Sequence, residues 1–523
     1  MAELWLRRNG VAVTPPPGVE LADPASLRRD FRSPSLLFKL ARYARVRVLA
    51  PQPETLDHRW ATLSTARLLS HGTVELGKPD GPFRRINTSE LIHLSAARLQ
   101  ASLRSGELIV RIRRLAQALA LPARPVRFTA HGGALCLRCD PWYGVTAGGS
   151  VAHIAGIVNE LSRRLPGTVL ASTDTVPTVD PAVGQLHLPA SRVWHDDREL
   201  AAIAANAAHA RALIDQLRTA PPALVYQRSA AFSLLGAWCA RRYRVPLVLE
   251  FNGSETWLAR HWGRPIARET LCDELELTAL RSADLVVAVS AAMRDGLLAR
   301  GLKPERVLCC PNGVDTQRYR PDVDGAELRA RLGWNDAIVI GFIGTCGPWH
   351  GIELLAQAFA RAHERCPRLR LLLIGDGVAL PAAREYLRTA GVLAAVHLPG
   401  LVPQHEGPHW LAACDVLVNP TLPNADGSPF FGSPTKLFEY VAMGRAVVSS
   451  NIGQASEVIA HDRTGLLVPP ADAEALSTSL IRLAADPDLR HRLGVAARAE
   501  AVARHGWNAR VDLILGRLRE LLP

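Results

Sequence analysis

From Val126 onward, short apolar runs alternate with longer segments in which apolar residues recur at helical spacing, as in Ala231–Tyr243. This alternation is typical of parallel sheets built from strand–helix–strand units. We therefore predict a doubly wound α/β domain in the first half of the chain. Its predicted strands are Ala134–Cys139, Val169–Ser172, Ala223–Tyr226, Pro246–Glu250, Leu285–Val289 and Arg306–Cys310.

The strand pattern stops at Pro311-Asn312-Gly313, and the segment from Arg318 to Asp336 mixes Pro, Asp and Gly. A chain of 523 residues is also too long for one core, since single cores stop growing near roughly 250–300 residues. We therefore predict two such domains, at residues 128–320 and 337–504, joined by a linker. The predicted strands of the second are Ala337–Ile343, Leu369–Ile374, Val396–Leu398, Asp415–Asn419, Ala446–Ser449 and Gly465–Val468.

Residues 1–127 fit neither series, and their fold is not predicted beyond one strand at Arg45–Ala50 and a basic amphipathic helix around Leu91–Leu121. They hold 21 Lys and Arg against 10 Asp and Glu, so most of the net charge of +12 lies here. No interleaved aromatic motif or helix-turn-helix signature accompanies this charge, and we expect no nucleic acid partner. The region is either a solvated basic face or a contact with an anionic membrane surface. The arginines of the predicted helix are Arg98, Arg104, Arg111, Arg113 and Arg114.

No apolar run approaches the roughly 20 residues that span a bilayer, and no apolar signal segment follows Arg7 and Arg8. The nine cysteines include one pair, Cys136-x-x-Cys139, which has no second Cys or His pair at zinc-site spacing. We expect buried, reduced thiols and a cytoplasmic protein, peripheral to the inner face of a membrane if the basic region binds there.

Gly148-Gly149-Ser150 lies between the first predicted strand and the helix that begins near Val151. Free backbone amides and a helix N-terminus meet at such a place, where anionic ligands bind well. A plain structural turn is the alternative. His153 falls one helical turn later, where it either faces the same ligand or is an ordinary core histidine.

Ser433-Pro434-Thr435-Lys436-Leu437-Phe438-Glu439 has the pattern of a helix start, with Ser433 expected at the N-cap and Pro434 at the first helical position. Lys436 and Glu439 are three residues apart and share a face near the positive end of the helix dipole. Lys436 is suited to phosphate oxygens and Glu439 to sugar hydroxyls. The alternative is an ordinary surface ion pair of little energetic consequence.

These motifs resemble those of the family 4 glycosyltransferases, and the match runs from about Ala134 to Gly506. The family has the GT-B fold, in which two Rossmann-like domains face a central cleft. The motifs that carry the resemblance are Gly148-Gly149 with His153, Ser282-Ala283-Asp284 to Ser290, Pro311-Asn312-Gly313-Val314-Asp315, Leu373-Ile374-Gly375-Asp376-Gly377, Glu439 with Ala442-Met443-Gly444, and Gly465-Leu466-Leu467-Val468.

The resemblance implies transfer of a sugar from a nucleotide diphosphate donor with retention of anomeric configuration. It also implies that Glu439 binds the donor's ribose, that Gly148 and Gly149 approach its diphosphate, and that the helix at 505–523 packs on the first domain. No cofactor is implied, since the donor is a substrate. The full set of expected donor contacts is Gly148, Gly149, Gly344, Thr345, His350, Gly375, Ser433, Thr435, Lys436, Leu437 and Glu439.

Several positions depart from the family pattern. Thr345 and His350 stand where Arg and Lys are usual, Phe431 replaces the first acid of the Glu-x7-Glu motif, and Asn252 replaces an interdomain histidine. An Asp-x-Asp sequence occurs only in the linker, at Asp322-Val323-Asp324, so we expect no metal site. Helix N-termini and Lys436 are expected to supply the positive potential instead, with a neutral His350 as a hydrogen-bond donor. The expected catalytic residues are Lys436, Asp426 as a substitute acid, and His153.

A polar and aromatic cluster follows the predicted strand that ends at Glu250, and it suits a sugar acceptor that stacks on rings and forms hydrogen bonds. The cluster is Asn252-Gly253-Ser254-Glu255-Thr256-Trp257 and Arg260-His261-Trp262. The alternative is a structural loop with packed tryptophans. The acceptor itself, a glycan, a lipid-linked sugar or a small molecule, is left open. So are two other activities, a nucleotide-sugar-binding scaffold without catalysis and a GT-B phosphorylase or epimerase. The expected acceptor contacts are Asn252, Glu255, Trp257, Arg260 and His261.

Overall fold

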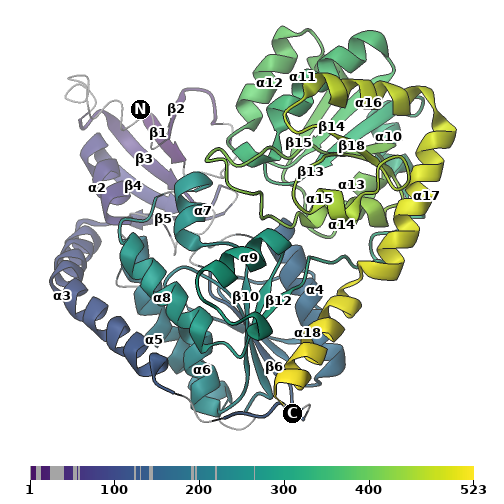
Figure 1. The fold of residues 1–523 in the computed structure, drawn as a ribbon. Coiled ribbons are helices and arrows are strands. Elements are labelled where there is room, and N and C mark those ends of the chain that lie inside the picture. Colours follow the sequence, from purple (N-terminus) through teal and green to yellow (C-terminus); the bar gives the residue numbers. More distant parts are fainter. Residues whose placement is uncertain are drawn as a thin grey trace.

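A computed structural model describes the chain apart from residues 1, 8–12, 14, 24–39, 51–55, 57–58, 80, 123–124, 130, 141–144, 146, 190–193, 195–196, 218–220, 264 and 523. In the described residues, three sheets follow one another along the sequence (Figure 1). Two of them are entirely parallel, which confirms the doubly wound architecture predicted for the larger part of the chain.

The N-terminal region forms a five-stranded sheet of order β2-β1-β3-β4-β5, parallel except for the β4–β5 pair. Sequence patterns identified β3 and α3 but not the other strands, which are short and carry charges. Glu3 and Glu75, for example, pair with Arg47 across adjacent strands. The elements are β1 (Glu3–Arg7), β2 (Val19–Ala22), β3 (Tyr43–Leu49), α2 (Arg59–Leu69), β4 (Ser70–Gly77), β5 (Phe83–Ile86) and α3 (Thr88–Ala120).

The second sheet has seven parallel strands in the order β12-β11-β10-β9-β6-β7-β8. All six predicted strands are present within a residue or two, and β8, which is polar and mostly exposed, is additional. Its elements are β6 (Ala134–Arg138), α4 (Gly149–Arg164), β7 (Val169–Ser172), β8 (Gly184–His187), α5 (Arg198–Leu217), β9 (Leu224–Arg228), α6 (Leu235–Tyr243), β10 (Leu247–Phe251), α7 (Glu255–His261), α8 (Glu269–Ser282), β11 (Leu285–Ala288), α9 (Ala291–Ala299), η3 (Pro304–Arg306) and β12 (Val307–Cys309).

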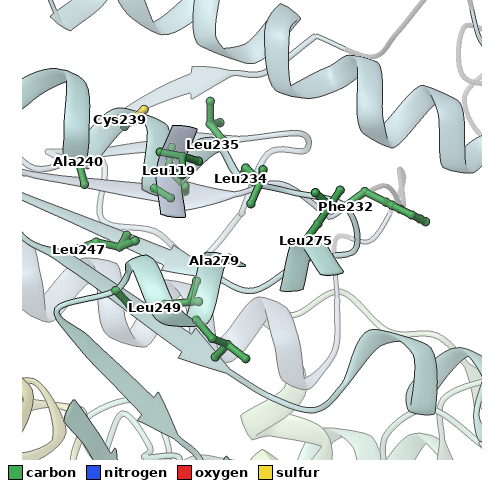
Figure 2. Packing of buried hydrophobic residues seen from close by; sticks show 14 of the residues in the cluster. Leu119, Phe232, Leu234, Leu235, Cys239, Ala240, Leu247, Leu249, Leu275 and Ala279 are labelled. Atoms are coloured by element: carbon green, nitrogen blue, oxygen red, sulfur yellow. The ribbon is translucent and has the colours of Figure 1, made fainter. Parts of the chain in front are cut away.

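Helices cover both faces of this sheet, so its central strands are buried on both sides, as parallel strands require. On one face, Leu119 from the end of α3 packs in the same cluster as Leu235 of α6 and Leu247 of β10 (Figure 2). The N-terminal region is therefore joined to the second sheet by a shared core as well as by the chain.

The third sheet has six parallel strands in the order β15-β14-β13-β16-β17-β18. Each predicted strand of this domain is present, and the linker contains one short helix, α10. The elements are α10 (Ala326–Arg331), β13 (Ile338–Ile343), η4 (Pro348–His350), α11 (Ile352–Arg365), β14 (Leu369–Ile374), α12 (Leu380–Thr389), η5 (Leu393–Ala395), β15 (Val396–Gly400), α13 (Gly407–Ala412), β16 (Val416–Asn419), α14 (Thr435–Ala442), β17 (Ala446–Ser450), α15 (Ala455–Val458), β18 (Leu466–Val468), α16 (Ala473–Ala485), α17 (Pro487–Arg504) and α18 (Trp507–Leu521).

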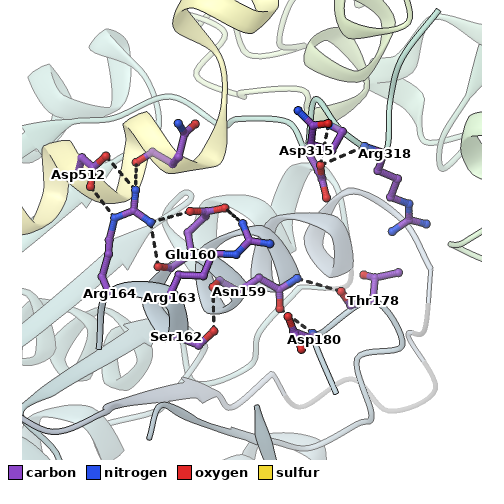
Figure 3. Close-up of polar contacts among 12 residues, drawn as sticks. Asn159, Glu160, Ser162, Arg163, Arg164, Thr178, Asp180, Asp315, Arg318 and Asp512 are labelled. Carbon is purple, nitrogen blue, oxygen red and sulfur yellow. Dashed lines mark hydrogen bonds and ion pairs between the residues drawn. The ribbon is translucent and has the colours of Figure 1, made fainter. Parts of the chain in front are cut away.

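The last helix, α18, returns to the second sheet, as the family resemblance implied (Figure 1). Trp507, Val511 and Leu518 pack into the core beneath α4. On the surface, the Arg164 guanidinium of α4 bonds Asp512 of α18, with 2.9 Å between Nη2 and Oδ2 (Figure 3). The chain thus crosses between the two large domains twice.

No helix among the described residues is long and apolar enough to cross a membrane.

Candidate active site

A cavity of about 380 Å³ lies between the two large sheets. Segments that follow the carboxyl ends of β6, β9 and β10 line one side, and segments that follow β13, β14 and β16 line the other. Ligands of doubly wound domains bind at this edge of the sheet. The lining includes most of the expected donor residues, namely Gly148, Gly149, Gly344, Thr345, His350, Gly375, Ser433, Thr435, Lys436 and Glu439, together with His153 and Asn252.

The N-termini of α4 and α14 meet at this cavity. A Cβ atom at Gly149 would lie 2.4 Å from Thr435 Oγ1, so only glycine permits the two helix starts to approach so closely. Unsatisfied amides of both helices and the positive ends of both dipoles therefore face one small volume. The Gly148 amide donates to Gln404 Oε1 at 2.7 Å, so an anion that bound this amide would replace Gln404.

The expectation that Ser433 caps α14 is wrong. Pro434 holds the N-cap position, and no side chain caps the helix. The Ser433 hydroxyl instead accepts a hydrogen bond from the backbone N–H of Asn312 at 3.0 Å and donates one to Gln454 Oε1. The contact with Asn312 joins the two domains. Leu437 does not line the cavity either: its side chain is in the core, and its amide donates to the Pro434 carbonyl. A proline whose φ suits the first helical turn is equally compatible with the cap itself.

Lys436 and Glu439 are buried at the cavity wall and do not form a surface ion pair. The Lys436 ammonium lies 4.3 Å from the Phe342 ring centroid, an attractive cation–π contact, and it borders Gly344. Burial lowers the pKa of Lys436 to about 7, although Cys346 and Glu439 oppose this shift. Burial also raises the pKa of Glu439, against a hydrogen bond from Tyr319 and the nearby Arg318 and Lys436 charges. Both groups are held apart from water, as preorganised charge stabilisers are.

His350 is neutral. Burial and the neighbouring Lys436 charge lower its pKa to about 2, against the effect of its bond to the Thr345 carbonyl. Since a carbonyl oxygen only accepts, His350 Nδ1 carries the proton and donates to Thr345 O. The other ring nitrogen, Nε2, is then an acceptor. From the sequence we expected His350 to donate a hydrogen bond to the donor's phosphates, but its one N–H is used by Thr345. The Nε2 atom suits a sugar hydroxyl better than a phosphate.

His153 is held on both ring nitrogens. Its Nε2 contacts Glu250 Oε2, and its Nδ1 contacts Asn312 Oδ1. The ring also packs edge-on to Trp507, at 5.0 Å between centroids. His153 is thus a cavity-lining residue that links the second sheet, the segment 311–315 and α18.

The expected acceptor cluster is largely set back from the cavity. Of its five residues, Asn252 lines the cavity, while Arg260 pairs with Glu269 on the surface. Burial and the nearby Asp140 and Glu276 carboxylates raise the pKa of Glu255 to about 8, so this side chain is mostly protonated at neutral pH. Asp426 does not line the cavity; its carboxylate accepts from Trp257 Nε1 at 2.8 Å and lies 3.6 Å from His261 Nε2.

Aromatic rings close the cavity on this side. Trp262 stacks on Trp349 of the other domain, with centroids 4.3 Å apart and planes at 20°. Phe431, which stands in place of the family's acid, packs between Trp257 and Trp262. A carboxylate between these two tryptophan rings would be poorly solvated, which accounts for the apolar residue there. Trp262, which belongs to the predicted polar and aromatic cluster, lines the cavity, and so does Trp349, which was not among the expected site residues.

Three further cavity or supporting residues were missed: Gln404, Arg228 and Glu250. Arg228 is the last residue of β9 and Gln404 follows β15; many residues at strand ends can face a ligand, and nothing in the spacing of these two distinguishes them. Glu250 had a detectable signal, since it is a lone carboxylate inside the apolar strand Leu247–Phe251. A buried charge in such a strand requires specific partners.

The chain belongs to the group 1, family 4 glycosyltransferases. The family described as "Glycosyltransferase Family 4" matches residues 147–318, and "Glycosyl transferases group 1" matches residues 337–486. A GDP-mannose-dependent alpha-(1-6)-phosphatidylinositol monomannoside mannosyltransferase of Mycolicibacterium smegmatis is 31% identical over 301 residues, which are 56% of this chain and 74% of the relative. An alpha-maltose-1-phosphate synthase of the same organism is 30% identical, over 54% of this chain and 75% of the relative. This chain is accordingly a glycosyltransferase.

Solved structures confirm the GT-B fold. HepE of Anabaena in complex with UDP and glucose superposes with a TM-score of 0.58 at 20% identity and covers 74% of this chain and 99% of its own. Sucrose-phosphate synthase of Thermosynechococcus elongatus gives a TM-score of 0.58 at 20% identity, over 75% of this chain and 99% of its own. The uncovered quarter of the chain is about the size of the N-terminal region.

Proposed function

We propose that this enzyme transfers a sugar from a nucleotide diphosphate sugar to a hydroxyl acceptor, without a metal ion and with retention of anomeric configuration. The observation that carries the proposal is the meeting of two helix N-termini with Lys436 and Glu439 in one cavity. The amides and Lys436 bind the diphosphate, and Glu439 accepts hydrogen bonds from the ribose. These groups give the leaving diphosphate the stabilisation that a metal ion gives in other enzymes.

Retention is proposed because, among the described residues that line the cavity, no carboxylate other than Glu439 is present to act as a base for the incoming hydroxyl. Phe431 and its aromatic neighbours occupy the position of the usual carboxylate, and Asp426 is engaged with Trp257 and Ser428. In this arrangement the departing phosphate itself takes the proton of the incoming hydroxyl on the same face of the sugar. Asn252, Trp262 and Trp349 border the space in which the acceptor binds.

The names of related proteins suggest which donor nucleotides to test. One relative is named as GDP-mannose-dependent, and a structure of the same fold was solved with UDP and glucose. The test is a thermal-shift panel of GDP, UDP, ADP and dTDP with EDTA present. A nucleotide at 100 times its dissociation constant adds roughly 2.7 kcal/mol of stability. One nucleotide should raise the melting temperature in wild type and lose that effect in Glu439→Gln, and a panel with no effect would contradict the proposal.

We also propose that α3 holds the enzyme at an anionic membrane surface. Four apolar side chains, spaced by seven, four and seven residues, lie on one face of the helix and are exposed, and Arg104 and Arg114 are exposed on the same helix. Basic amphipathic helices of this type bind anionic bilayers. The four apolar residues are Ile92, Leu99, Leu103 and Val110, exposed by 63%, 64%, 78% and 48%.

Sedimentation of the full chain with phosphatidylserine-containing vesicles tests this surface. Leu99→Ser with Leu103→Ser should lower the bound fraction at least about fivefold, because each buried leucine contributes roughly 1.5–3 kcal/mol. Val495→Ser with Val502→Ser, which changes exposed valines on α17, is the matched control and should leave binding unchanged. Equal binding of all three proteins would show that α3 is not the contact.

A further inference from the structure

The hydrogen bonds around His153 fix its protonation state. Asn312 Nδ2 donates to the Ser433 carbonyl oxygen, which can only accept, so the amide oxygen of Asn312 must face His153 Nδ1. On the other side, Nε2 faces a carboxylate oxygen of Glu250. Both partners are acceptors, and both ring nitrogens therefore carry a proton.

Glu250 is bound as a carboxylate on every side. Tyr226 donates its hydroxyl to Oε2 at 2.6 Å, Arg228 donates Nη1 to Oε1 at 3.1 Å, and Asn252 donates its amide to Oε1. Although burial alone would raise it, His153, Arg228 and Asn252 bring the pKa of Glu250 down to about 2. A buried carboxylate that accepts from four donors is most stable in the ionised form.

The three charged groups are arranged asymmetrically. His153 and Arg228 line the cavity, whereas Glu250 lies behind them and does not. One carboxylate between two cations leaves a net charge of +1, with the positive groups toward the cavity. This charge lies one turn inside α4, whose N-terminus already favours anions.

We infer that His153 is a cation of the phosphate-binding site that acts on the donor's diphosphate through its charge, since both of its N–H groups are engaged by Asn312 and Glu250. We further infer that Glu250 is the positioning residue that keeps His153 protonated and holds it, with Arg228, at the cavity wall. The inference rests on the proposed function for the identity of the ligand. It explains how the site functions with neutral groups at Thr345 and His350. Lys436 and the His153–Arg228 pair then hold the diphosphate from opposite domains.

The first test needs no ligand. In protein labelled with 15N-histidine, the ring resonances of His153 are identified by their loss in His153→Gln. Both nitrogens should have imidazolium shifts from pH 6 to 8.5 in wild type and in Glu250→Asp, and neutral-ring shifts at pH 8.5 in Glu250→Gln. A neutral tautomer in wild type at pH 7 would overturn the inference.

The second test measures the dissociation constants of GDP and UDP by calorimetry in wild type and Glu250→Gln. Other groups near the network titrate or carry charge, so the dissociation constant of Glu250→Gln is divided by that of wild type at each pH, which removes the effects common to both proteins. These groups are Tyr226, Cys310, Arg510, Lys436 and Glu439. The ratio of the variant's dissociation constant to that of wild type should be at least about 3 at pH 8.5, because the variant loses the cation at the cavity wall, whereas the carboxylate that it also loses lies behind that wall. A ratio near one at pH 8.5 would overturn the inference.

Glu276→Gln is the matched control, because Glu276 is also a buried acid of this domain but pairs with Arg300 outside the cavity. Glu276→Gln should leave the dissociation constants of GDP and UDP within about twofold of the wild-type values at pH 8.5. Should neither nucleotide bind wild type, the proposed function fails, while the histidine spectra still decide the protonation of His153.

Discussion

The replacement of Lys436 by methionine is the perturbation most directly tied to the proposed chemistry. Methionine keeps much of the side chain's volume and its packing against Phe342 but removes the ammonium. Two unit charges about 4 Å apart, at an effective dielectric constant near 20, interact by about 4 kcal/mol. Since about 1.4 kcal/mol corresponds to a tenfold change in rate, Lys436→Met should lower kcat by roughly 10²–10³. The diphosphate gains charge as the glycosidic bond breaks, so the effect belongs to kcat.

Glu439→Gln should weaken donor binding and leave the chemical step largely unchanged. Its carboxylate meets ribose hydroxyls that scarcely change during the reaction, so donor binding should weaken by roughly 1.5–3 kcal/mol, seen mainly as a raised KM. The assay is initial-rate release of nucleoside diphosphate over a range of donor concentrations, with single-turnover experiments to identify the chemical step. A near-normal kcat for Lys436→Met, when chemistry limits the rate, would refute this account of leaving-group stabilisation.

Three further outcomes are expected. Because Lys436 must be protonated and its pKa is about 7, kcat/KM of wild type should fall as the pH rises through about 7. Lys436→Met should not show this fall, and a fall that persists in the variant would assign the titration to another group. The folded pKa of Lys436 lies below the ordinary 10.5, so the cost of burying its charge is full below pH 7 and fades toward pH 10.5. Lys436→Met should therefore melt at least about 2 °C higher than wild type at pH 6.5, by calorimetry, and by less at pH 9.5, and a lower melting temperature at pH 6.5 would contradict the burial argument. His350→Gln should leave the pH profile between 6 and 8 unchanged, because the pKa of His350 is about 2, and an altered profile would show that its protonation matters.

The sequence predicted the two parallel domains well because their strands are buried on both faces. Runs such as Leu369–Ile374 are apolar without interruption, and the glycines and prolines between elements give clear boundaries. The N-terminal sheet was missed because its strands are short and partly exposed. In β4, for example, only Val74 and Leu76 are buried apolar side chains, and Glu75 lies between them. Such alternation over a few residues is a weak signal.

The candidate site was predicted unevenly for a physical reason. Motif residues near helix starts, such as Gly149 and Lys436, line the cavity because strand ends and helix N-termini are fixed by the fold. Residues such as Asp426 and Arg260 lie elsewhere, since loop conformation decides where their side chains point. The His153–Glu250 contact joins positions almost a hundred residues apart, and no local pattern in one sequence reveals such a pair.

Donor hydrolysis in the absence of acceptor is the sharpest test of metal-independent, retaining sugar transfer, since it requires no knowledge of the acceptor. Purified enzyme with EDTA would be incubated with GDP-mannose and with UDP-glucose, and proton NMR would follow the anomer of the released sugar. We expect slow release of nucleoside diphosphate from one donor, with the anomeric configuration retained in the first product, and loss of that release in Lys436→Met. Release that requires added divalent metal, or a first product of inverted configuration, would contradict it.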